Sequence, residues 1–178
     1  MAQMTENLPA VEIPADAQEN VRRVCFVCTG NTCRSPMAAA VANALAAKRG
    51  ESPTLRAYSA GLYAHGGDLI SPHAKEALEL AGIEPVEGFD YHRHTAHTLT
   101  LEEAERYDLL IGLSSEHCME LMMRYPQLAQ RIVGMPSSIS DPFGGDLSVY
   151  RACLEEITVG VKQLLFPSDQ NGTGGADA

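Results

Sequence analysis

Short runs of apolar residues alternate with longer amphipathic segments along most of this chain. Val24–Cys28 is a continuous apolar run, which is typical of a strand buried on both faces of a parallel sheet. Leu55–Ser59 and Leu109–Leu113 predict two further strands, and Ile132–Val133 predicts a short one. The pattern therefore predicts a central sheet of about four strands.

The segments between and after these strands have helical spacing. The clearest is the last, where one apolar face repeats every three or four residues through Leu147, Tyr150, Leu154, Ile157, Val161 and Leu164. The other predicted helices are Ser35–Arg49, about Ser71–Ala81, a short one opening with a capping box at Thr100–Glu103, and about Ser115–Arg124. This alternation predicts an α/β fold, a doubly wound parallel sheet with helices on both faces.

The length fits one domain with a tail at each end. A chain of 178 residues has the size of a single domain, which we place at residues 21–166. Residues 1–20 are rich in Pro, Ala and acidic side chains without periodicity, and residues 167–178 are mostly polar residues and Gly. Both tails are therefore expected to be disordered.

Charge and cysteine content narrow the class of protein. The formal net charge of −10 argues against nucleic-acid binding. No apolar stretch approaches the roughly 18 residues that a membrane helix needs, and the first residues lack the pattern of a secretory signal. Five cysteines are an odd number, which favours reduced thiols. We expect a cytoplasmic enzyme that binds neither nucleic acid nor membrane.

The segment after the first strand carries the strongest chemical signal. Cys28 ends the strand, five small or polar residues follow, and Arg34 precedes a Ser-Pro pair that predicts a helix N-cap at Ser35. Such a loop directs backbone N–H groups and the helix dipole at one point, where an oxyanion such as phosphate can bind. The same field is expected to lower the pKa of Cys28 and make it a nucleophile, and Arg34 can grip two phosphoryl oxygens. The predicted phosphate-binding residues are Thr29, Gly30, Asn31, Thr32, Cys33, Arg34 and Ser35.

This Cys-x5-Arg-Ser segment resembles the phosphate-binding loop of the low-molecular-weight protein tyrosine phosphatase family. A second motif of that family, Asp-Pro-aromatic, matches Asp141-Pro142-Phe143. The resemblance implies the phosphotyrosine protein phosphatase I-like fold and a phosphocysteine intermediate formed on Cys28. It assigns the general acid and base role to Asp141. We expect neither a metal nor a cofactor, because loop amides and Arg34 can neutralise the phosphoryl charge.

The resemblance also implies supporting roles around the loop. Ser35 would donate a hydrogen bond to the nucleophile, and Asn31 would hold a strained loop backbone through a polar network. The residues that match the rest of that network are Ser59 and His94.

A histidine-rich segment suggests a metal site as an alternative. His92, His94 and His97 lie close together in the sequence with Asp90 just before them. One copy of so loose a spacing is a weak signal, and His94 already has a role by resemblance. We therefore predict no metal site.

The remaining cysteines have two interpretations. Cys33 is a candidate redox partner of Cys28, because a disulfide between them would shield the nucleophile from irreversible oxidation. A small buried side chain is the alternative for Cys33. Packing is the expected role of Cys25, Cys118 and Cys153.

The variable positions of the two motifs bear on the substrate. Animal phosphotyrosine enzymes of the family usually have a bulky aliphatic residue where this chain has Thr32, and a tyrosine pair where it has Phe143-Gly144. Both motifs resemble those of the bacterial protein arginine phosphatases more closely. A threonine hydroxyl suits a hydrophilic guanidinium or the attacking water, and a planar guanidinium can stack on Phe143. We predict a phosphoarginine phosphatase, with phosphotyrosine as the alternative substrate.

Two other functions are compatible with this kind of loop. Thioredoxin-coupled arsenate reductases share the fold but need an additional pair of cysteines in mid-chain, and none lies between Cys33 and Cys118. An inactive phosphoprotein-binding module would not need Cys28, Arg34 and Asp141 together. The expected partner is a phosphoprotein substrate, and the expected state is a monomer.

Overall fold

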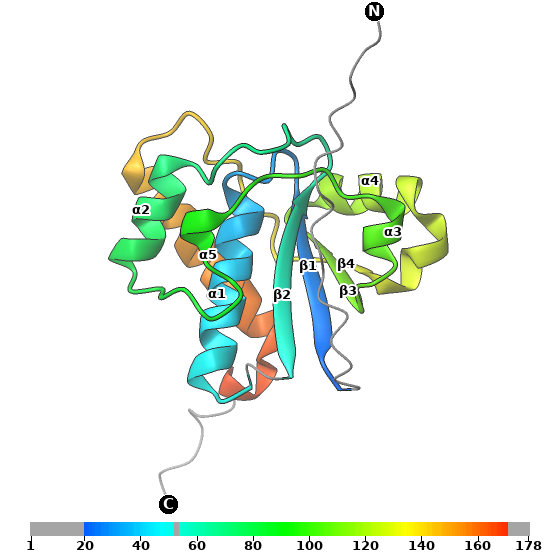
Figure 1. Ribbon diagram of the computed structural model, residues 1–178, viewed down its shortest axis with the longest axis horizontal. Coiled ribbons are helices and arrows are strands. Elements are labelled where there is room, and N and C mark those ends of the chain that lie inside the picture. Colours follow the sequence, from blue (N-terminus) through cyan, green and yellow to red (C-terminus); the bar gives the residue numbers. More distant parts are fainter. Residues whose placement is uncertain (1–19, 52–53, 171–178) are drawn as a thin grey trace, which may run out of the picture.

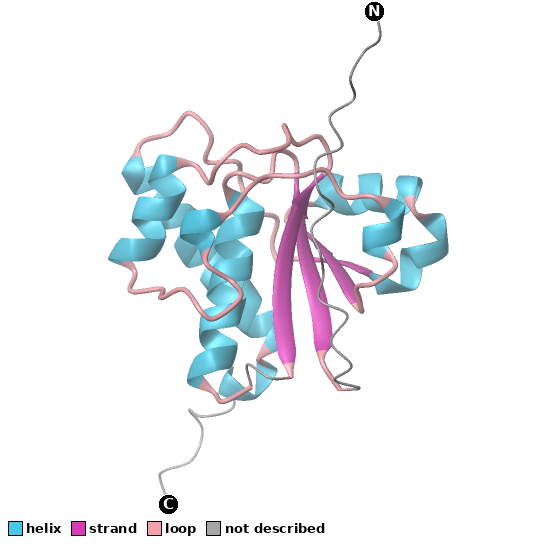
Figure 2. Ribbon diagram, in the orientation of Figure 1, coloured by secondary structure: helices cyan, strands magenta, loops and turns pink. Residues whose placement is uncertain are grey.

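The computed structural model describes residues 20–51 and 54–170, with a parallel sheet of four strands at its centre (Figures 1 and 2). The strands are β1 (Arg22–Cys28), β2 (Leu55–Gly61), β3 (Leu109–Gly112) and β4 (Ile132–Gly134). Their order is β2-β1-β3-β4, so β1 pairs with β2 on one side and β3 on the other. Each strand lies where an apolar run predicted it.

Helices cover both faces of the sheet (Figure 1). On one face lie α1 (Arg34–Lys48), α2 (Pro72–Leu80) and α5 (Leu147–Leu165), and on the other α3 (Leu101–Ala104), α4 (Ser115–Arg124) and the 3-10 helix η2 (Pro126–Arg131). Successive side chains of β1 point to opposite faces of the sheet and so contribute to both apolar cores. Val24 and Phe26 belong to one core, and Cys25 and Val27 belong to the other. The predicted doubly wound α/β fold is confirmed.

The two long helices are buried differently. α1 packs against β1, β2, α2 and α5, and nearly all of its side chains are buried. Its run of alanines suits this position, because small side chains let neighbouring elements approach closely. α5 instead buries the single apolar face that its periodicity predicted, including Tyr150, Leu154 and Ile157.

The start of α1 differs from the prediction. The helix begins at Arg34 with Cys33 as its N-cap, and no side chain caps it. Ser35 is therefore not the N-cap; it lies in the first turn, and its hydroxyl faces Cys28 and Asn31. Because Ser35 is already inside the helix, its hydroxyl bonds to residues of the loop instead of capping the helix end.

The capping box before α3 is half formed. The Thr100 hydroxyl accepts a hydrogen bond from the Glu103 N–H at 3.2 Å, as predicted. The Glu103 carboxylate does not return to Thr100 but accepts bonds from Tyr107 and the ring of His97. The short helix is thereby tied to the segment that precedes it.

The ends of the domain are only partly described. The predicted tails lie largely outside the described residues, at positions 1–19 and 171–178. At the start of the C-terminal segment, Pro167–Gln170 forms a short 3-10 helix, η3, directly after the buried Phe166. Within the described part of the chain, no helix combines the length and the apolar character needed to cross a membrane.

Candidate active site

The segment Cys28–Ser35, here called the phosphate loop, joins β1 to α1 at the carboxyl end of the sheet (Figure 1). Cys28 is 3 % exposed, and its Sγ lies 3.0 Å from the Ser35 Oγ. The loop is held to the segment that follows β2, because the Cys28 carbonyl accepts from the Leu62 N–H and the Thr29 carbonyl from the Tyr63 N–H. The predicted nucleophile therefore lies at the end of the central strand, where open α/β sheets bind their ligands.

The protonation of Cys28 reflects opposing influences. Burial raises the pKa of its thiol, while the Ser35 hydroxyl, the backbone N–H groups of Ser35 and Asn31 and the charge of Arg34 lower it. Burial has the larger effect, so the expectation of a lowered pKa was wrong. The expectation considered the dipole and the charges but not the loss of water around the sulfur.

Arg34 connects the phosphate loop to the loop of the predicted acid. Its side chain is buried, and its Nη1 donates to the Ile139 carbonyl at 3.0 Å. Its Nη2 lies 3.5 Å from Oδ2 of Asp141. The two predicted motifs, more than a hundred residues apart in the sequence, therefore meet at this guanidinium.

Asn31 is at the centre of a buried polar network. It is fully buried and has a φ of 57°, in the left-handed region that non-glycine residues seldom adopt. Its Nδ2 donates to Ser35 Oγ at 2.9 Å and to Ser59 Oγ at 3.0 Å. Its Oδ1 accepts from the His97 N–H at 3.1 Å. Every polar atom of this side chain is thus used to hold the loop.

His94 completes the network from the other side of the loop. Its Nε2 lies 2.7 Å from the Asn31 carbonyl oxygen, which can only accept, so this nitrogen carries the proton. Burial lowers the pKa of His94, which favours the neutral imidazole. The structure thus brings together the four residues that the resemblance selected, Asn31, Ser35, Ser59 and His94.

The segment Ser140–Gly145, here called the acid loop, is far more open. The Asp141 side chain is 56 % exposed, and its Oδ1 accepts from the Phe143 N–H at 3.1 Å. Phe143 itself is 79 % exposed. A carboxyl group in contact with Arg34 and an exposed aromatic ring two residues further on are both accessible to a substrate.

Thr32, the predicted specificity residue, and Cys33, the candidate redox partner, lie beside α2 and α5. The Thr32 carbonyl accepts from the Ser71 N–H at 2.8 Å, and its hydroxyl lies 3.7 Å from the Cys33 sulfur. That sulfur is also 3.4 Å from the Tyr150 hydroxyl, which in turn lies 3.3 Å from the Ser71 hydroxyl. All the cysteines are unpaired, so no disulfide joins Cys33 to Cys28 in this structure.

The histidine-rich segment does not converge on one point. His92 lies between Asp90 and Glu79, His94 bonds to the phosphate loop, and His97 bonds to Glu103. In the described ranges, 20–51 and 54–170, no three potential metal ligands cluster. The three rings are used separately, as parts of the surrounding structure.

One residue of the site was missed by the sequence reasoning. His117, near the start of α4, lies with its Nε2 3.0 Å from the Thr29 hydroxyl of the phosphate loop. Its only sequence signal is its position shortly after β3, since β1 and β3 are adjacent and parallel and therefore end at the same edge.

A family comparison decides what this site is. The family model for low molecular weight phosphotyrosine protein phosphatase matches residues 23–172. The chain belongs to this family. The resemblance drawn from the two motifs is confirmed, and this member of the family is a cysteine-dependent phosphatase.

Its relatives include enzymes named for two different substrates. A protein-arginine-phosphatase from Geobacillus stearothermophilus is 35% identical over 149 residues, which are 80% of this chain and 93% of that protein. The low molecular weight protein-tyrosine-phosphatase PtpB of Staphylococcus haemolyticus is 32% identical over 142 residues, 76% of this chain and 91% of that one. Among solved structures, a low molecular weight protein tyrosine phosphatase from T. tengcongensis is 34% identical, with a TM-score of 0.73 over 81% of this chain and 97% of that one.

Proposed function

We propose that this phosphatase hydrolyses phosphoarginine in proteins through a phosphocysteine intermediate. The observation that carries the substrate preference is Thr32, a small residue with a hydroxyl at a half-buried position of the phosphate loop. The carbonyl of Thr32 is fixed by the Ser71 N–H, so its side chain can vary without moving the loop. Support also comes from the exposed Phe143 ring, on which a planar guanidinium can stack.

In the first step, the Cys28 sulfur attacks phosphorus and the bond from phosphorus to the substrate nitrogen breaks. Asp141 gives its proton to the departing nitrogen, and Arg34 with the loop N–H groups stabilises the charge on the phosphoryl oxygens. Because burial raises the pKa of Cys28, the thiol must lose its proton as the substrate binds. The phosphoryl group itself, whose second pKa in related esters is about 6, is a base that can accept it.

In the second step, water attacks the phosphorus of the phosphocysteine. The Asp141 carboxylate removes a proton from that water, the bond from phosphorus to sulfur breaks, and phosphate leaves. The Ser35 hydroxyl, 3.0 Å from Sγ, stabilises the departing thiolate with a hydrogen bond. Asp141 regains its proton from the water, and the proton that the phosphoryl group took from Cys28 returns to the sulfur before phosphate leaves. Both groups are thus restored, and the cycle closes without a cofactor or a metal.

Phosphotyrosine is the second candidate substrate, because a relative 32% identical to this chain is named a protein-tyrosine-phosphatase. An arsenate reductase would need a further cysteine pair that the sequence lacks between Cys33 and Cys118. The enzyme is further proposed to be monomeric and cytoplasmic and to act on a phosphoprotein. Its phosphatase domain comprises residues 21–166. Under oxidants, Cys33 would pair with Cys28 and protect it reversibly.

The test is kcat/KM on phosphoarginine and phosphotyrosine forms of one peptide. The wild-type chain should prefer phosphoarginine, and Thr32→Ile should reduce that preference by about tenfold or more, because bulk replaces a hydroxyl. Thr32→Val is the matched control, since it removes the hydroxyl without adding volume and separates polarity from size. A preference for phosphotyrosine that neither substitution changes would refute phosphoarginine as the substrate. It would not contradict the phosphocysteine mechanism.

A further inference from the structure

The imidazole of His117 lies between α4 and the phosphate loop, and no step of the proposed chemistry uses it. The residue is 5 % exposed. Its Nε2 lies 3.0 Å from the Thr29 hydroxyl, and its Nδ1 lies 2.9 Å from the hydroxyl of Ser114. Both nitrogens therefore have partners, one on each side of the ring.

The ring is held in place by the helix that carries it. Ser114 is the N-cap of α4 and accepts a hydrogen bond from the His117 N–H at 3.4 Å. The same hydroxyl bonds to the ring, so backbone and side chain of His117 are tied to one residue. Burial and the charge of Arg34 lower the pKa of His117 to about 4, which keeps the imidazole neutral at neutral pH.

Thr29, the residue that His117 contacts, has little packing of its own. It directly follows the nucleophile and is exposed. Its carbonyl accepts from the Tyr63 N–H at 3.0 Å, and a Cβ at the neighbouring Gly61 would lie 2.7 Å from that same oxygen. The backbone of Thr29 is thus fixed from the β2 side, and its side chain is fixed by His117 from the α4 side.

We propose that His117 is a positioning residue that fixes Thr29 and, through it, the first turn of the phosphate loop in the shape that binds a phosphoryl group. Asn31 and its partners fix the middle of the loop from the opposite side, so His117 supplies the support that this network does not reach. The inference rests on the proposed function of the loop as the phosphoryl-binding site.

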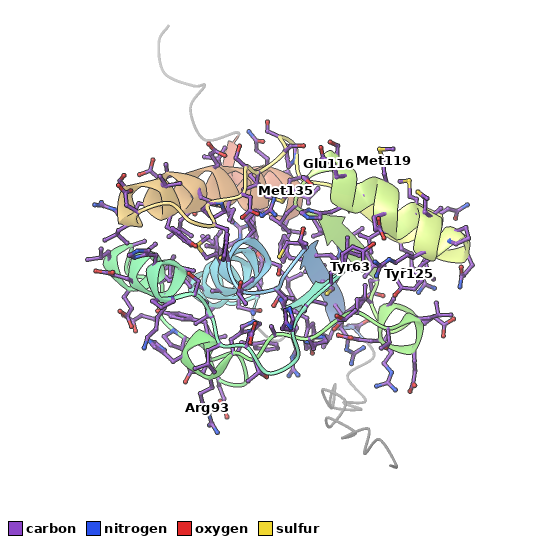
Figure 3. The ribbon with its side chains drawn as sticks, turned by 90° about the horizontal axis from the view of Figure 1, so that it is seen from above. Tyr63, Arg93, Glu116, Met119, Tyr125 and Met135 are labelled. Carbon is purple, nitrogen blue, oxygen red and sulfur yellow. The ribbon has the colours of Figure 1, made fainter. Side chains whose placement is uncertain are left out.

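Four variants test whether His117 acts through Thr29. They are His117→Phe, His117→Gln, Thr29→Val and the double variant His117→Phe/Thr29→Val. For each we would measure kcat/KM on a phosphorylated peptide, the inhibition constant of inorganic phosphate, and the melting temperature. Tyr125→Phe is the matched control, because it removes one buried hydrogen bond, to the Leu99 carbonyl, just beyond the end of α4 (Figure 3).

His117→Phe should lower kcat/KM by about 10-fold to 100-fold and weaken phosphate inhibition by a similar factor, since a loop misplaced by about 1 Å costs this much. His117→Gln should recover part of the loss, because its amide can still bond to Thr29. The double variant should lose no more than the worse single variant, as expected for residues that act as one unit. Tyr125→Phe should lower the melting temperature and leave kcat/KM within about twofold.

Losses that multiply in the double variant would overturn the proposal, and so would a His117→Phe protein with a lower melting temperature and unchanged phosphate inhibition. Should His117→Phe fail to fold, Thr29→Val and the double variant His117→Gln/Thr29→Val replace it, and the double variant should lose no more activity than Thr29→Val alone. A wild-type chain that binds phosphate but hydrolyses neither peptide would refute the proposed function alone, because phosphate affinity still reports the effect of His117.

Discussion

The phosphate loop and the acid loop meet at Arg34 but are built in opposite ways. In the phosphate loop, Asn31 and Ser35 are fully buried and bonded on every side. In the acid loop, Asp141 and Phe143 are mostly exposed, and the Asp141 carboxylate is held by one backbone N–H and a 3.5 Å contact with Arg34. The difference suggests a division of labour: the part that binds the constant phosphoryl group is fixed before substrate arrives, while the part that meets the variable leaving group is left adaptable.

The largest expected effect comes from the centre of the buried loop. Cys28→Ser should reduce turnover by about 10⁴-fold or more, because no other group in the loop can take the nucleophile's place. Phosphate binding, measured by titration calorimetry, should be retained, since Arg34 and the loop N–H groups are untouched. Appreciable residual turnover would contradict the assignment of Cys28 as nucleophile.

Asn31→Ala tests whether the buried network serves catalysis or only folding. The substitution removes three hydrogen bonds from a residue with positive φ, so kcat/KM should fall by about 10²-fold to 10³-fold and the free energy of unfolding by about 2–4 kcal/mol.

Asn43→Ala is the control for Asn31→Ala. Asn43 is also buried, and its amide makes two hydrogen bonds with the backbone of Ala57, away from the phosphate loop. It should lose a similar free energy of unfolding and keep its kcat/KM. If both variants lose activity in proportion to stability, the network has no specific role in the site.

Asp141→Asn tests the exposed acid loop. Substrates with poor leaving groups should be slowed by about 10²-fold and activated aryl phosphates much less, because only the former need a proton. The melting temperature should barely change, since the side chain is 56 % exposed. Equal slowing of both substrate types would exclude Asp141 as the proton donor.

The buried His117 beside the phosphate loop should make the stability of the protein sensitive to acid. The pKa of His117 is about 4 in the folded protein against about 6.5 when unfolded, so between these values the unfolded chain binds more protons. Stability should therefore fall as pH drops through this window, by on the order of 2 kcal/mol at pH 4.5. Chemical unfolding of the wild-type and His117→Gln proteins at pH 7 and pH 4.5 isolates this contribution. An identical pH dependence in both would show that His117 does not titrate as described.

The smallest expected effect concerns Phe143. Because the ring is 79 % exposed, Phe143→Ala should change the free energy of unfolding by less than about 0.5 kcal/mol. We expect kcat/KM on a phosphoarginine peptide to fall several-fold through loss of stacking on the guanidinium. Phe143→Leu, which keeps bulk without a π face, separates stacking from simple contact; equal activity of the Leu variant and the wild type would argue against stacking.

What the sequence revealed about the site depended on how local each signal was. Cys28 and Arg34 lie on one short segment between a strand and a helix, so their chemistry could be inferred directly. The involvement of Ser59 and His94 came from resemblance, because nothing in the local sequence shows that they meet Asn31. His117 had neither signal, and only the pairing of β1 with β3 brings it to the loop.

The errors have a common physical cause. The Ser-Pro pair correctly predicted a helix, but the helix begins at Arg34, and the Ser35 hydroxyl bonds to Cys28 and Asn31, contacts that the pair alone does not reveal. The expected pKa shift of Cys28 omitted burial, which depends on α1, β2 and the rest of the core rather than on the loop sequence. The fold itself was predictable, because apolar runs and amphipathic periodicity are repeated over whole elements.

Gly61 is a position outside the reacting groups where we expect substitutions to abolish turnover. It contributes no side chain, yet one added carbon would press against the Thr29 carbonyl and approach the Asn31 Cβ to 3.1 Å. In a saturation library scored for turnover, this position should therefore be as restricted as the nucleophile itself. Turnover in this protein accordingly depends on the empty space beside Gly61 as well as on the sulfur of Cys28.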